Sequence, residues 1–255
     1  MIKLPKNITN FFVDTWDLWN FARKFAVALF RKPVEVQETI KQCFQIGYKS
    51  LPLVSITGFI IGLTLALQII PTLDKFGAVS LIPQMLSIAI VREIGPVIIG
   101  LICAGKMGSG IGAELGSMKV TEQIDAMEVS AVNPFKFLVV TRVMAAMLTV
   151  PILVIYADTL ALFGGYLAMS VNADMTLKLF FSTVFETLTF EDVLPATIKT
   201  FFFGFGIGLV GSYKGFNCSR GTESVGIAAN SSVVLASLLV ILMDLIAVQI
   251  SSILF

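Results

Sequence analysis

The sequence contains no histidine in 255 residues and only three cysteines, Cys43, Cys103 and Cys218. The cysteines lie far apart and form no CxxC pair, so a disulfide framework and a thiolate metal site both lack support. The absence of histidine removes the side chain most often used for acid–base catalysis, which is also a common metal ligand. The sequence therefore predicts no catalytic residue, no metal site and no cofactor bound by this chain.

Charged residues are scarce as well, at 14% of the chain, whereas a soluble domain carries roughly a quarter. Hydrophobic residues make up 56% and gather in long uncharged runs. A helix that spans a bilayer needs about 20 mostly apolar residues, and several runs reach that length. The sequence predicts an all-α polytopic membrane protein with about five transmembrane helices, near residues 51–71, 82–105, 138–171, 193–213 and 231–254.

The basic residues are distributed unevenly along the chain. Eight of the 18 lysines and arginines precede Pro52, and others fall in the middle segment and the last loop. The alternate connections carry few, with Lys75 in one and Lys178 in the other. Because basic loops stay cytoplasmic, we expect a cytoplasmic N-terminus and, after five crossings, a C-terminus on the outer, periplasmic side. Residues 1–50 are predicted to form a cytoplasmic or interfacial helical segment, and residues 51–255 the transmembrane domain.

The N-terminal segment has an amphipathic pattern. Asp17 and Lys24 share one helical face, while Trp16 and Trp19 lie on another. This pattern predicts an amphipathic helix in the cytoplasmic membrane interface, with its tryptophans at headgroup depth. The alternative is a helix that packs on a soluble partner.

Five glycines interrupt the hydrophobic runs in "AGKMGSGIGAELGSMKVTEQIDAMEV", residues 104–129. The segment lacks GxxxxGK[ST], and so does the rest of the chain, which excludes a Walker-type ATP site. Gly108, Gly112 and Gly116 recur at every fourth residue and make a small-residue stripe, which allows close approach of another helix. We therefore expect the second crossing to continue as helix past Lys106. The stripe could equally pack against another helix of the same chain or against a second chain.

Residues 120–131 predict a short acidic amphipathic helix between the second and third crossings, on the cytoplasmic side. Val120, Ile124, Met127 and Ala131 share one face, and Thr121 is a candidate N-cap. Such a helix suits docking in a groove of another protein. The alternative is a helix resting on lipid, where its acids would meet an anionic surface. The candidate docking residues are Thr121, Glu122, Gln123, Ile124, Asp125, Met127 and Glu128.

Residues 92–145 contain several short motifs: Arg-Glu-x-Gly-Pro-Val at 92–97, Gly-Ser at 108–109, Ala-Glu-Leu-Gly-x-Met at 113–118, Thr-Glu-Gln at 121–123 and Asn-Pro at 133–134. With these motifs the stretch resembles the signature of the MlaE family, the ABC-transporter permeases linked to MCE proteins. A second stretch, residues 221–246, is similar to the family's glycine-rich loop and final helix, which contains Asp244. The resemblance covers about residues 35–255. Lys106, Asn133 and Thr141 depart from the usual family residues.

The resemblance implies a homodimeric permease in the inner membrane of a double-membrane bacterium or a related envelope. Two cytoplasmic ATPase subunits would bind ATP and Mg²⁺, and residues 120–131 would be the coupling helix that contacts them. A periplasmic MCE-domain assembly would exchange phospholipid with the permease in envelope lipid trafficking and outer-membrane lipid asymmetry. Some family members also have a STAS-domain subunit. No nucleic-acid partner is implied.

Arg92 and Glu93 lie inside an apolar span, where unpaired charge is expensive. Adjacent residues on a helix point apart, so the two side chains do not pair well with each other. A polar cavity for a lipid headgroup would accommodate both charges, with Leu65, Gln68, Leu73 and Phe76 as candidate acyl-chain contacts. The alternative is pairing between helices, with Asp158, Lys199 and Asp244 as candidate partners.

Two other function classes remain open at this point. An ion-coupled secondary transporter would use Arg92, Glu93, Asp158 and Asp244 as a relay. An intramembrane lipid-modifying enzyme would use the carboxylates as acid and base. The sequence shows no nucleophile elbow and no clustered acidic motif, which disfavours the enzyme, and an autonomous transporter has no need of an acidic docking helix.

Overall fold

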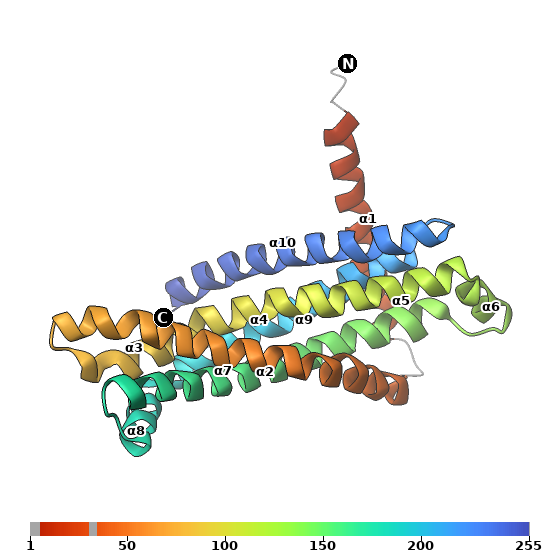
Figure 1. Ribbon diagram of the computed structural model, residues 1–255. Helices are drawn as coiled ribbons and strands as arrows, with labels where there is room; N and C mark the ends of the chain where they lie inside the picture. Colours follow the sequence, from red (N-terminus) through yellow and green to blue (C-terminus); the bar gives the residue numbers. More distant parts are fainter. Residues whose placement is uncertain (1–5, 31–34, 255) are drawn as a thin grey trace.

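The computed structural model describes residues 6–30 and 35–254, and in these two ranges the chain is helical with short connections and no strand (Figure 1). Five helical stretches are long and apolar enough to cross a membrane. The all-α prediction and the five crossings are therefore confirmed. The stretches are Val36–Lys75, Val79–Val120, Phe135–Asn172, Phe190–Phe216 and Thr222–Ser251.

The helices follow one another along the chain with little intervening loop. The second crossing combines a 3₁₀ turn, three α-helices and two π-helical turns, and the third begins with a π-helical turn. The elements are α1 (Lys6–Leu29), α2 (Val36–Lys75), η1 (Val79–Leu81), α3 (Ile82–Ala89), η2 (Ile90–Ile94), α4 (Gly95–Cys103), η3 (Ala104–Gly108), α5 (Ser109–Val120), α6 (Gln123–Val129), η4 (Phe135–Val140), α7 (Thr141–Asn172), α8 (Leu177–Thr187), α9 (Phe190–Phe216) and α10 (Thr222–Leu254).

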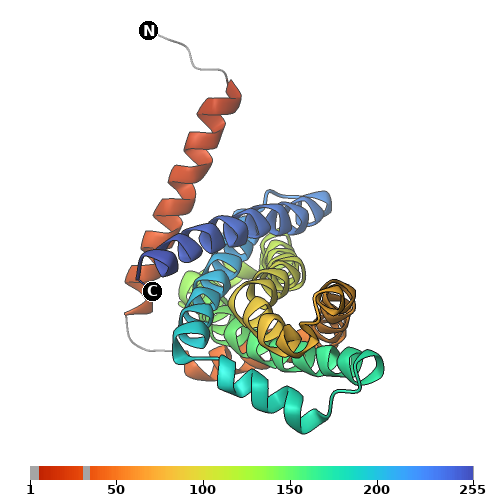
Figure 2. The same ribbon diagram turned by 90° about the vertical axis from the view of Figure 1, so that its left-hand side faces the viewer.

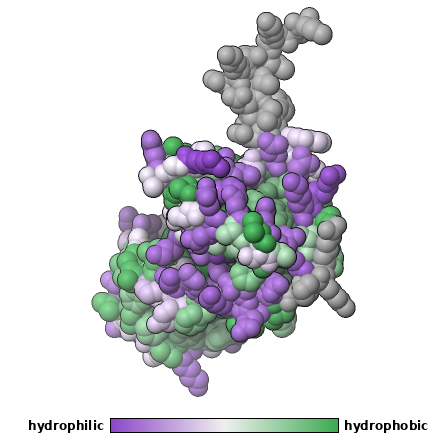
Figure 3. All heavy atoms as spheres, turned by 90° about the vertical axis from the view of Figure 1, so that its right-hand side faces the viewer, coloured by the Kyte–Doolittle hydropathy of each residue, from purple (hydrophilic) through white to green (hydrophobic). Residues whose placement is uncertain are grey.

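The long helices lie side by side, with α6 and α1 at one end of the bundle and α8 at the other (Figure 1). The C-terminal end of α10 lies at the end that carries α8. Hydrophilic side chains gather over the end that carries α6, which Figure 3 views directly. The bundle thus has one strongly polar end and long apolar sides, as a membrane-spanning protein requires.

Helix α1 crosses the direction of the bundle and extends beyond it (Figure 2). Its Phe21 and Phe25 are buried against Val139 and Val143, so the inner half of α1 is fixed to the third crossing. Trp16 and Trp19 lie exposed on the part of the helix that faces away from these contacts. Exposed tryptophans suit a membrane interface, and the interfacial location of α1 stays a prediction.

The closest helix contact joins α2 to α7. A Cβ on Gly58 would lie 2.7 Å from the carbonyl oxygen of Ala157, and one on Gly62 would overlap the carbonyl oxygen of Ala161. Backbones approach this closely only where side chains are absent, as in small-residue packing between membrane helices. Helix α2 begins at Val36 and runs unbroken through residue 50, the predicted boundary of the transmembrane domain.

The second crossing is helical as far as Val120, so the predicted extension past Lys106 is confirmed. It is not a regular α-helix, because η2 and η3 are π-helical turns. At η2 the Gly95 N–H donates to the Ile90 carbonyl, and Pro96 has no N–H to continue the pattern. Arg92 and Glu93 thus lie in a local irregularity of the helix, and such π turns frequently occur at functional sites.

Candidate functional site

Lys199 of α9 is the centre of a charged cluster inside the bundle. Its side chain is only 6% exposed, and Nζ donates to Glu93 Oε2 at 3.1 Å and to Asp244 Oδ1 at 2.9 Å. These three residues come from α9, η2 and α10. The cation therefore joins three separate crossings, and two carboxylates compensate its burial.

Arg92 pairs with a different residue from its neighbour Glu93. Its Nη1 lies 3.5 Å from Asp192 Oδ1, in the first turn of α9. Asp192 also accepts hydrogen bonds from the backbone N–H and the side chain of Thr189, which forms a capping box. Arg92 and Glu93 thus point to separate partners, as their adjacency on the helix requires.

The charged cluster lies beside two connected hollows. The smaller one, of about 80 Å³, is lined by Arg92, Glu93, Asp192 and Lys199, among others. The larger one, of about 470 Å³, lies between α9 and α10, and we call it the α9–α10 groove. The two hollows share Pro195, Lys199, Ala247 and Ser251. The groove is lined by Leu194, Pro195, Ile198, Lys199, Phe202, Met243, Ile246, Ala247, Ile250 and Ser251.

This arrangement is amphipathic. Two cations and three carboxylates gather at one place, and an elongated apolar surface continues from Lys199 along α9 and α10. Pockets that bind small ligands are mostly apolar with a few placed polar groups. The geometry suits a molecule with a charged head and a hydrocarbon tail.

Asp158 does not belong to this cluster. Its carboxyl packs on Gly95, where a Cβ would overlap Oδ1, and Oδ1 has no hydrogen-bond partner in the part of the chain that the structure describes. Of the three candidate partners of Arg92 and Glu93, Lys199 pairs with Glu93, whereas Asp244 pairs with Lys199 and Asp158 forms none of the ion pairs described. Asp158 lines a separate cavity, which shares only Ala196 with the smaller hollow.

The predicted acyl-chain contacts lie away from the α9–α10 groove. Leu65 and Leu73 pack against the cluster around Leu86 and Phe180, which fills the end of the bundle near α8. Gln68 and Phe76 are exposed on α2 and at its C-terminus. None of the four lines the groove, and their contact with lipid stays a prediction.

The helix after α5 is shorter than the predicted helix over residues 120–131, because a tight turn precedes it. Helix α6 covers only Gln123–Val129, and it starts after Glu122, which has the left-handed φ of 60°. Thr121 is not the N-cap, so that prediction is wrong. Its hydroxyl donates to the Ser117 carbonyl at 2.8 Å, because α5 continues to Val120 and Thr121 completes its last turn.

The apolar side of α6 faces the bundle. Ile124 is fully buried against Ile111, Leu115 and Leu138, and Met127 packs against the same cluster. The residues left for a partner are therefore mostly polar, with Ala126 and Val129 as the apolar exceptions. The exposed residues of this segment are Thr121, Glu122, Gln123, Ala126, Glu128 and Val129.

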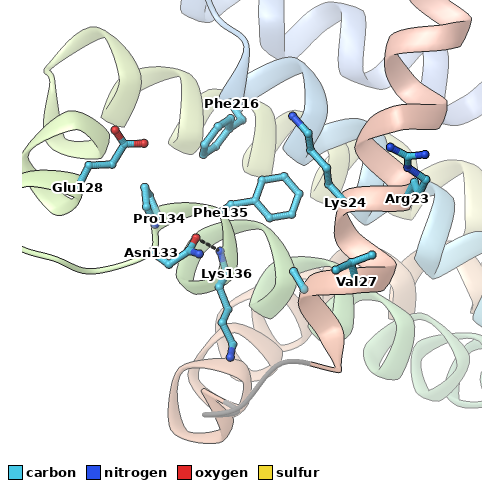
Figure 4. Close-up of a pocket in the computed structure, with 10 residues that line it drawn as sticks. Arg23, Lys24, Val27, Glu128, Asn133, Pro134, Phe135, Lys136 and Phe216 are labelled. Carbon is cyan, nitrogen blue, oxygen red and sulfur yellow. Dashed lines mark hydrogen bonds between the residues drawn. The ribbon is translucent and has the colours of Figure 1, made fainter.

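Three of the predicted docking residues have partners within α5, α6 or the turn between them. Asp125 Oδ1 accepts from Lys119 Nζ at 2.8 Å, and Gln123 Nε2 donates to Thr121 Oγ1 at 3.0 Å. Glu128 borders a hollow of about 460 Å³ toward α1, whose lining includes Arg23 and Lys24. Figure 4 shows Glu128 on one side of this hollow, Lys24 and Arg23 on the other, and Phe135 and Phe216 between them.

The glycine stripe faces α10 and the loop before it. A Cβ on Gly112 would lie 2.6 Å from Ser232 Oγ and 3.2 Å from the Ala228 carbonyl oxygen. The nearest atoms at Gly108 and Gly116 are farther away, at 3.7 Å and 3.5 Å. The stripe therefore packs within one chain, and Gly112 is its tightest position.

Some site residues were not predicted from the sequence. Asp192 and Glu114 are the partners of Arg92 and Arg142, with Arg142 Nη2 2.8 Å from Glu114 Oε1. The spacing Thr189-x-x-Asp192 is a recognisable capping box, so the helix start could have been found, although the pairing with Arg92 could not. A pairing between helices requires knowledge of which crossings are neighbours.

Comparisons with known proteins agree with this architecture. The model of the family described as "Permease MlaE" matches residues 39–250. A probable ABC transporter permease protein of Rickettsia felis is 36% identical over 230 residues, which cover 90% of this chain and 88% of the relative. The intermembrane phospholipid transport system permease protein MlaE of Haemophilus influenzae is 31% identical over 208 residues, 81% of this chain and 80% of the relative. A probable ABC transporter permease protein of Synechocystis is 30% identical over 198 residues, 78% of this chain and 75% of the relative.

Proposed function

The chain belongs to the MlaE permease family, and we propose that it is the membrane subunit of an ABC transporter that moves phospholipid between the inner membrane and an MCE-protein assembly. The observation that carries this proposal is the α9–α10 groove, with the charged cluster beside it. The name of the Haemophilus relative, which is that of a phospholipid transport permease, supports the same substrate class.

A phospholipid matches both parts of this site. Lys199 and Arg92 offer cationic donors to a phosphate, and Glu93, Asp192 and Asp244 offer acceptors to an amine. Glu93 and Arg92 are each about half exposed, with side-chain exposures of 46% and 48%, so they can exchange their present partners for a headgroup. The apolar groove gives an acyl chain a surface to follow beyond Lys199.

The α6 end is the expected docking site for two ATPase subunits, which would bind ATP and Mg²⁺. Glu122, Glu128 and Val129 are exposed there, and the inward face of α6 fixes the segment to the bundle through Ile124 and Met127. Movement of a docked ATPase would thus be transmitted to α5 and the third crossing. This chain would hydrolyse no ATP itself.

The proposed orientation places the α6 end in the cytoplasm. Arg23, Lys24, Lys119 and Lys136 all belong to elements at that end, and basic residues concentrate on the cytoplasmic side of membrane proteins. The N-terminal helix is then cytoplasmic or interfacial, and the C-terminal end of α10 is periplasmic.

A second copy of the chain, an MCE assembly at the α8 end and, as in some members, a STAS-domain subunit complete the proposed transporter. Helix α10 leaves one apolar side open, with Val234, Leu238, Ile241 and Leu245 exposed. A second copy would cover this side, although lipid alone satisfies it equally well. The MCE assembly would approach the open end of the bundle opposite α6.

Reconstitution in phospholipid vesicles tests the proposal and its competitor. We expect lipid movement to require the co-purified ATPase and ATP, and to continue when a protonophore removes the proton gradient. Transport that needs the gradient and no ATP would instead support an ion-coupled secondary transporter. Chemical change of the lipid during the assay would support the enzyme.

A further inference from the structure

Asp158 is a carboxyl group without a partner in the middle of a membrane-spanning helix. The residue is only 8% exposed, and Oδ1 has no hydrogen-bond donor among the described residues. Buried polar groups in proteins are nearly always hydrogen-bonded, and an unpaired carboxylate in an apolar region is especially costly. The ionised form of Asp158 would therefore require a partner that the described residues do not supply.

A cavity of about 160 Å³ lies next to Asp158, between α7, α9 and the start of α4. Three threonines line it together with apolar residues: Thr159 from α7, and Thr197 and Thr200 from α9. A water molecule takes about 30 Å³ of liquid volume, so the cavity has room for an ion and a few waters. It is distinct from the α9–α10 groove, with which it shares no lining residue.

The hydroxyl protons of the three threonines are already used within their own helices. Thr159, Thr197 and Thr200 donate their protons to the carbonyls of Ile155, Val193 and Thr197 in their own helices, at 2.7–2.9 Å. A hydroxyl has one proton and two lone pairs, so each oxygen retains only accepting capacity.

The backbone at the cavity adds to this excess of acceptors. Val91 and Pro96 line the cavity, and the Gly95 N–H is already used by the Ile90 carbonyl of the π turn. Pro96 has no N–H, so one carbonyl of this turn lacks its helical donor. Irregular backbone carbonyls of interrupted membrane helices bind alkali cations in other transporter folds.

We propose that Asp158, with the hydroxyl oxygens of Thr159, Thr197 and Thr200, binds a small alkali cation of the Na⁺ class between α7 and α9. Hard oxygen atoms are the preferred ligands of such ions, and a single carboxylate balances a single positive charge. A proton alone would neutralise Asp158 but would leave the threonine acceptors and the cavity unfilled.

The charged groups on the neighbouring elements do not replace the ion. Lys199 on α9 is near enough to act on Asp158 electrostatically, but its Nζ is bonded to Glu93 and Asp244. Arg92 on η2 pairs with Asp192. The charged residues of α2 lie before Ser50 or after Leu73, and α3 and α4 contain none.

A bound cation would connect α7 to α9 and to the π turn that carries Arg92 and Glu93. Its ligands come from α7 and α9, and Asp158 packs directly on Gly95. Occupancy would thus stabilise the helices around the lipid site without contact with lipid. The inference concerns a different cavity from the proposed transport site, so either can fail without the other.

The first test is labelling of Asp158 with a hydrophobic carbodiimide, which reacts with protonated carboxyl groups in apolar surroundings. The full-length protein with its co-purified subunits is treated in phospholipid vesicles at fixed pH, in NaCl or in choline chloride of equal ionic strength, and Asp158 is read by mass spectrometry. We expect NaCl to reduce labelling severalfold, because Na⁺ and the proton compete for one carboxylate. Thr200→Val, which keeps the shape and removes an acceptor, is expected to weaken this protection.

The second test is thermal stability of the same preparation. A ligand that binds only the folded state raises Tm with its concentration, so NaCl is expected to stabilise relative to choline chloride. Asp158→Asn should abolish that difference while retaining the fold, because it keeps the shape beside Gly95 without the charge. Ser212→Ala removes another buried hydroxyl without a partner and should leave the Na⁺ effect unchanged.

Labelling that depends on pH but not on Na⁺ overturns the proposal, because Asp158 would then bind only a proton. Absence of labelling under all conditions also overturns it, since the cavity would not exchange with its surroundings. If Na⁺ still raises the Tm of Asp158→Asn, the ion binds elsewhere and the proposal is also overturned.

Discussion

Lys199 lies between two carboxylates that belong to two other membrane crossings. Its burial is possible because Glu93 and Asp244 share the positive charge at 3.1 and 2.9 Å. Removing the cation leaves two carboxylates facing each other in a region of low dielectric constant, whereas removing one carboxylate leaves the cation with the other. The members of the cluster are therefore unequal in their effect on stability.

Lys199→Met is expected to destabilise the protein and Glu93→Gln to affect transport alone. For Lys199→Met we expect the free energy of unfolding to fall by about 2–3 kcal/mol, which corresponds to roughly 4–12 °C in Tm. The loss is smaller than the roughly 3–5 kcal/mol of a fully buried pair because Glu93 is half exposed. Glu93→Gln should keep Tm close to the parent because Asp244 remains, while ATP-dependent lipid transport falls. Thermal unfolding of the purified complex and transport in vesicles measure the two effects. A fall in the Tm of Glu93→Gln as large as that of Lys199→Met would mean that Glu93 has only a structural role.

The sequence identified most of the charged residues but not their partners. Arg92, Glu93, Asp158 and Asp244 stand out because charge is rare in apolar spans, which is a local property. Pairing depends on which crossings are neighbours, so the sequence left Asp158 and Lys199 as equal candidates, and Asp192 was missed altogether. The acyl-chain residues on α2 were chosen from depth alone, and the structure places Leu65 and Leu73 in a different part of the bundle.

At the level of elements, the apolar face of α6 packs on the protein's own bundle, whereas the sequence pattern alone assigned it to a partner. The apolar residues Ile124 and Met127 were predicted to support docking, but they anchor α6 to its own bundle. The surface left for a partner consists mainly of Glu122, Gln123 and Glu128. Asp125 is partly neutralised by Lys119.

Charge reversal of Glu122 and Glu128 to lysine is therefore expected to uncouple the ATPase. Two reversed charges would oppose a surface matched to acids, and recovery of the ATPase with the permease should fall strongly. Glu186→Lys on exposed α8, at the opposite end, is the matched control and should retain the ATPase. Normal ATPase recovery in the Glu122/Glu128 double variant would remove α6 from the docking interface.

Gly112→Leu is expected to destabilise the contact of α5 with α10. The new side chain would meet Ser232 Oγ and the Ala228 carbonyl oxygen, and overpacking costs about 1–3 kcal/mol. Gly110→Leu is the control on the same helix, because a Cβ there meets nothing within 4 Å. Thermal unfolding should give a lower Tm for Gly112→Leu than for Gly110→Leu. Equal Tm values would contradict the close packing at Gly112.

At the level of the whole molecule, length and composition were sufficient to predict five crossings and an all-helical fold. These properties follow from the bilayer thickness and from the need to satisfy every backbone hydrogen bond. The π turns at 90–94 and 104–108, the start of α2 at Val36 and the buried side of α1 could not be predicted. They depend on packing between distant segments, as at Phe21 and Val139, and not on local periodicity.

The proposed orientation predicts which cysteines a membrane-impermeant thiol reagent reaches. Cys43 and Cys218 are partly exposed near the α6 end and should react in inverted vesicles, whereas Cys103 is buried and should not react. A cysteine introduced at Val171, which is exposed near α8, should react only from the outside of intact cells from which the outer membrane has been removed. The reverse pattern would invert the topology.

The central claim is that phospholipid occupies the α9–α10 groove next to Lys199, and site-specific photo-crosslinking in the complete transporter tests it most directly. A photoreactive residue at Phe202 in the groove is compared with one at Ile152, which is exposed on α7 and reports ordinary surrounding lipid. We expect phospholipid adducts at Phe202 that change during ATP turnover and decrease in Glu93→Gln, while adducts at Ile152 respond to neither. Adducts at Phe202 that behave like those at Ile152 in both comparisons would contradict the account.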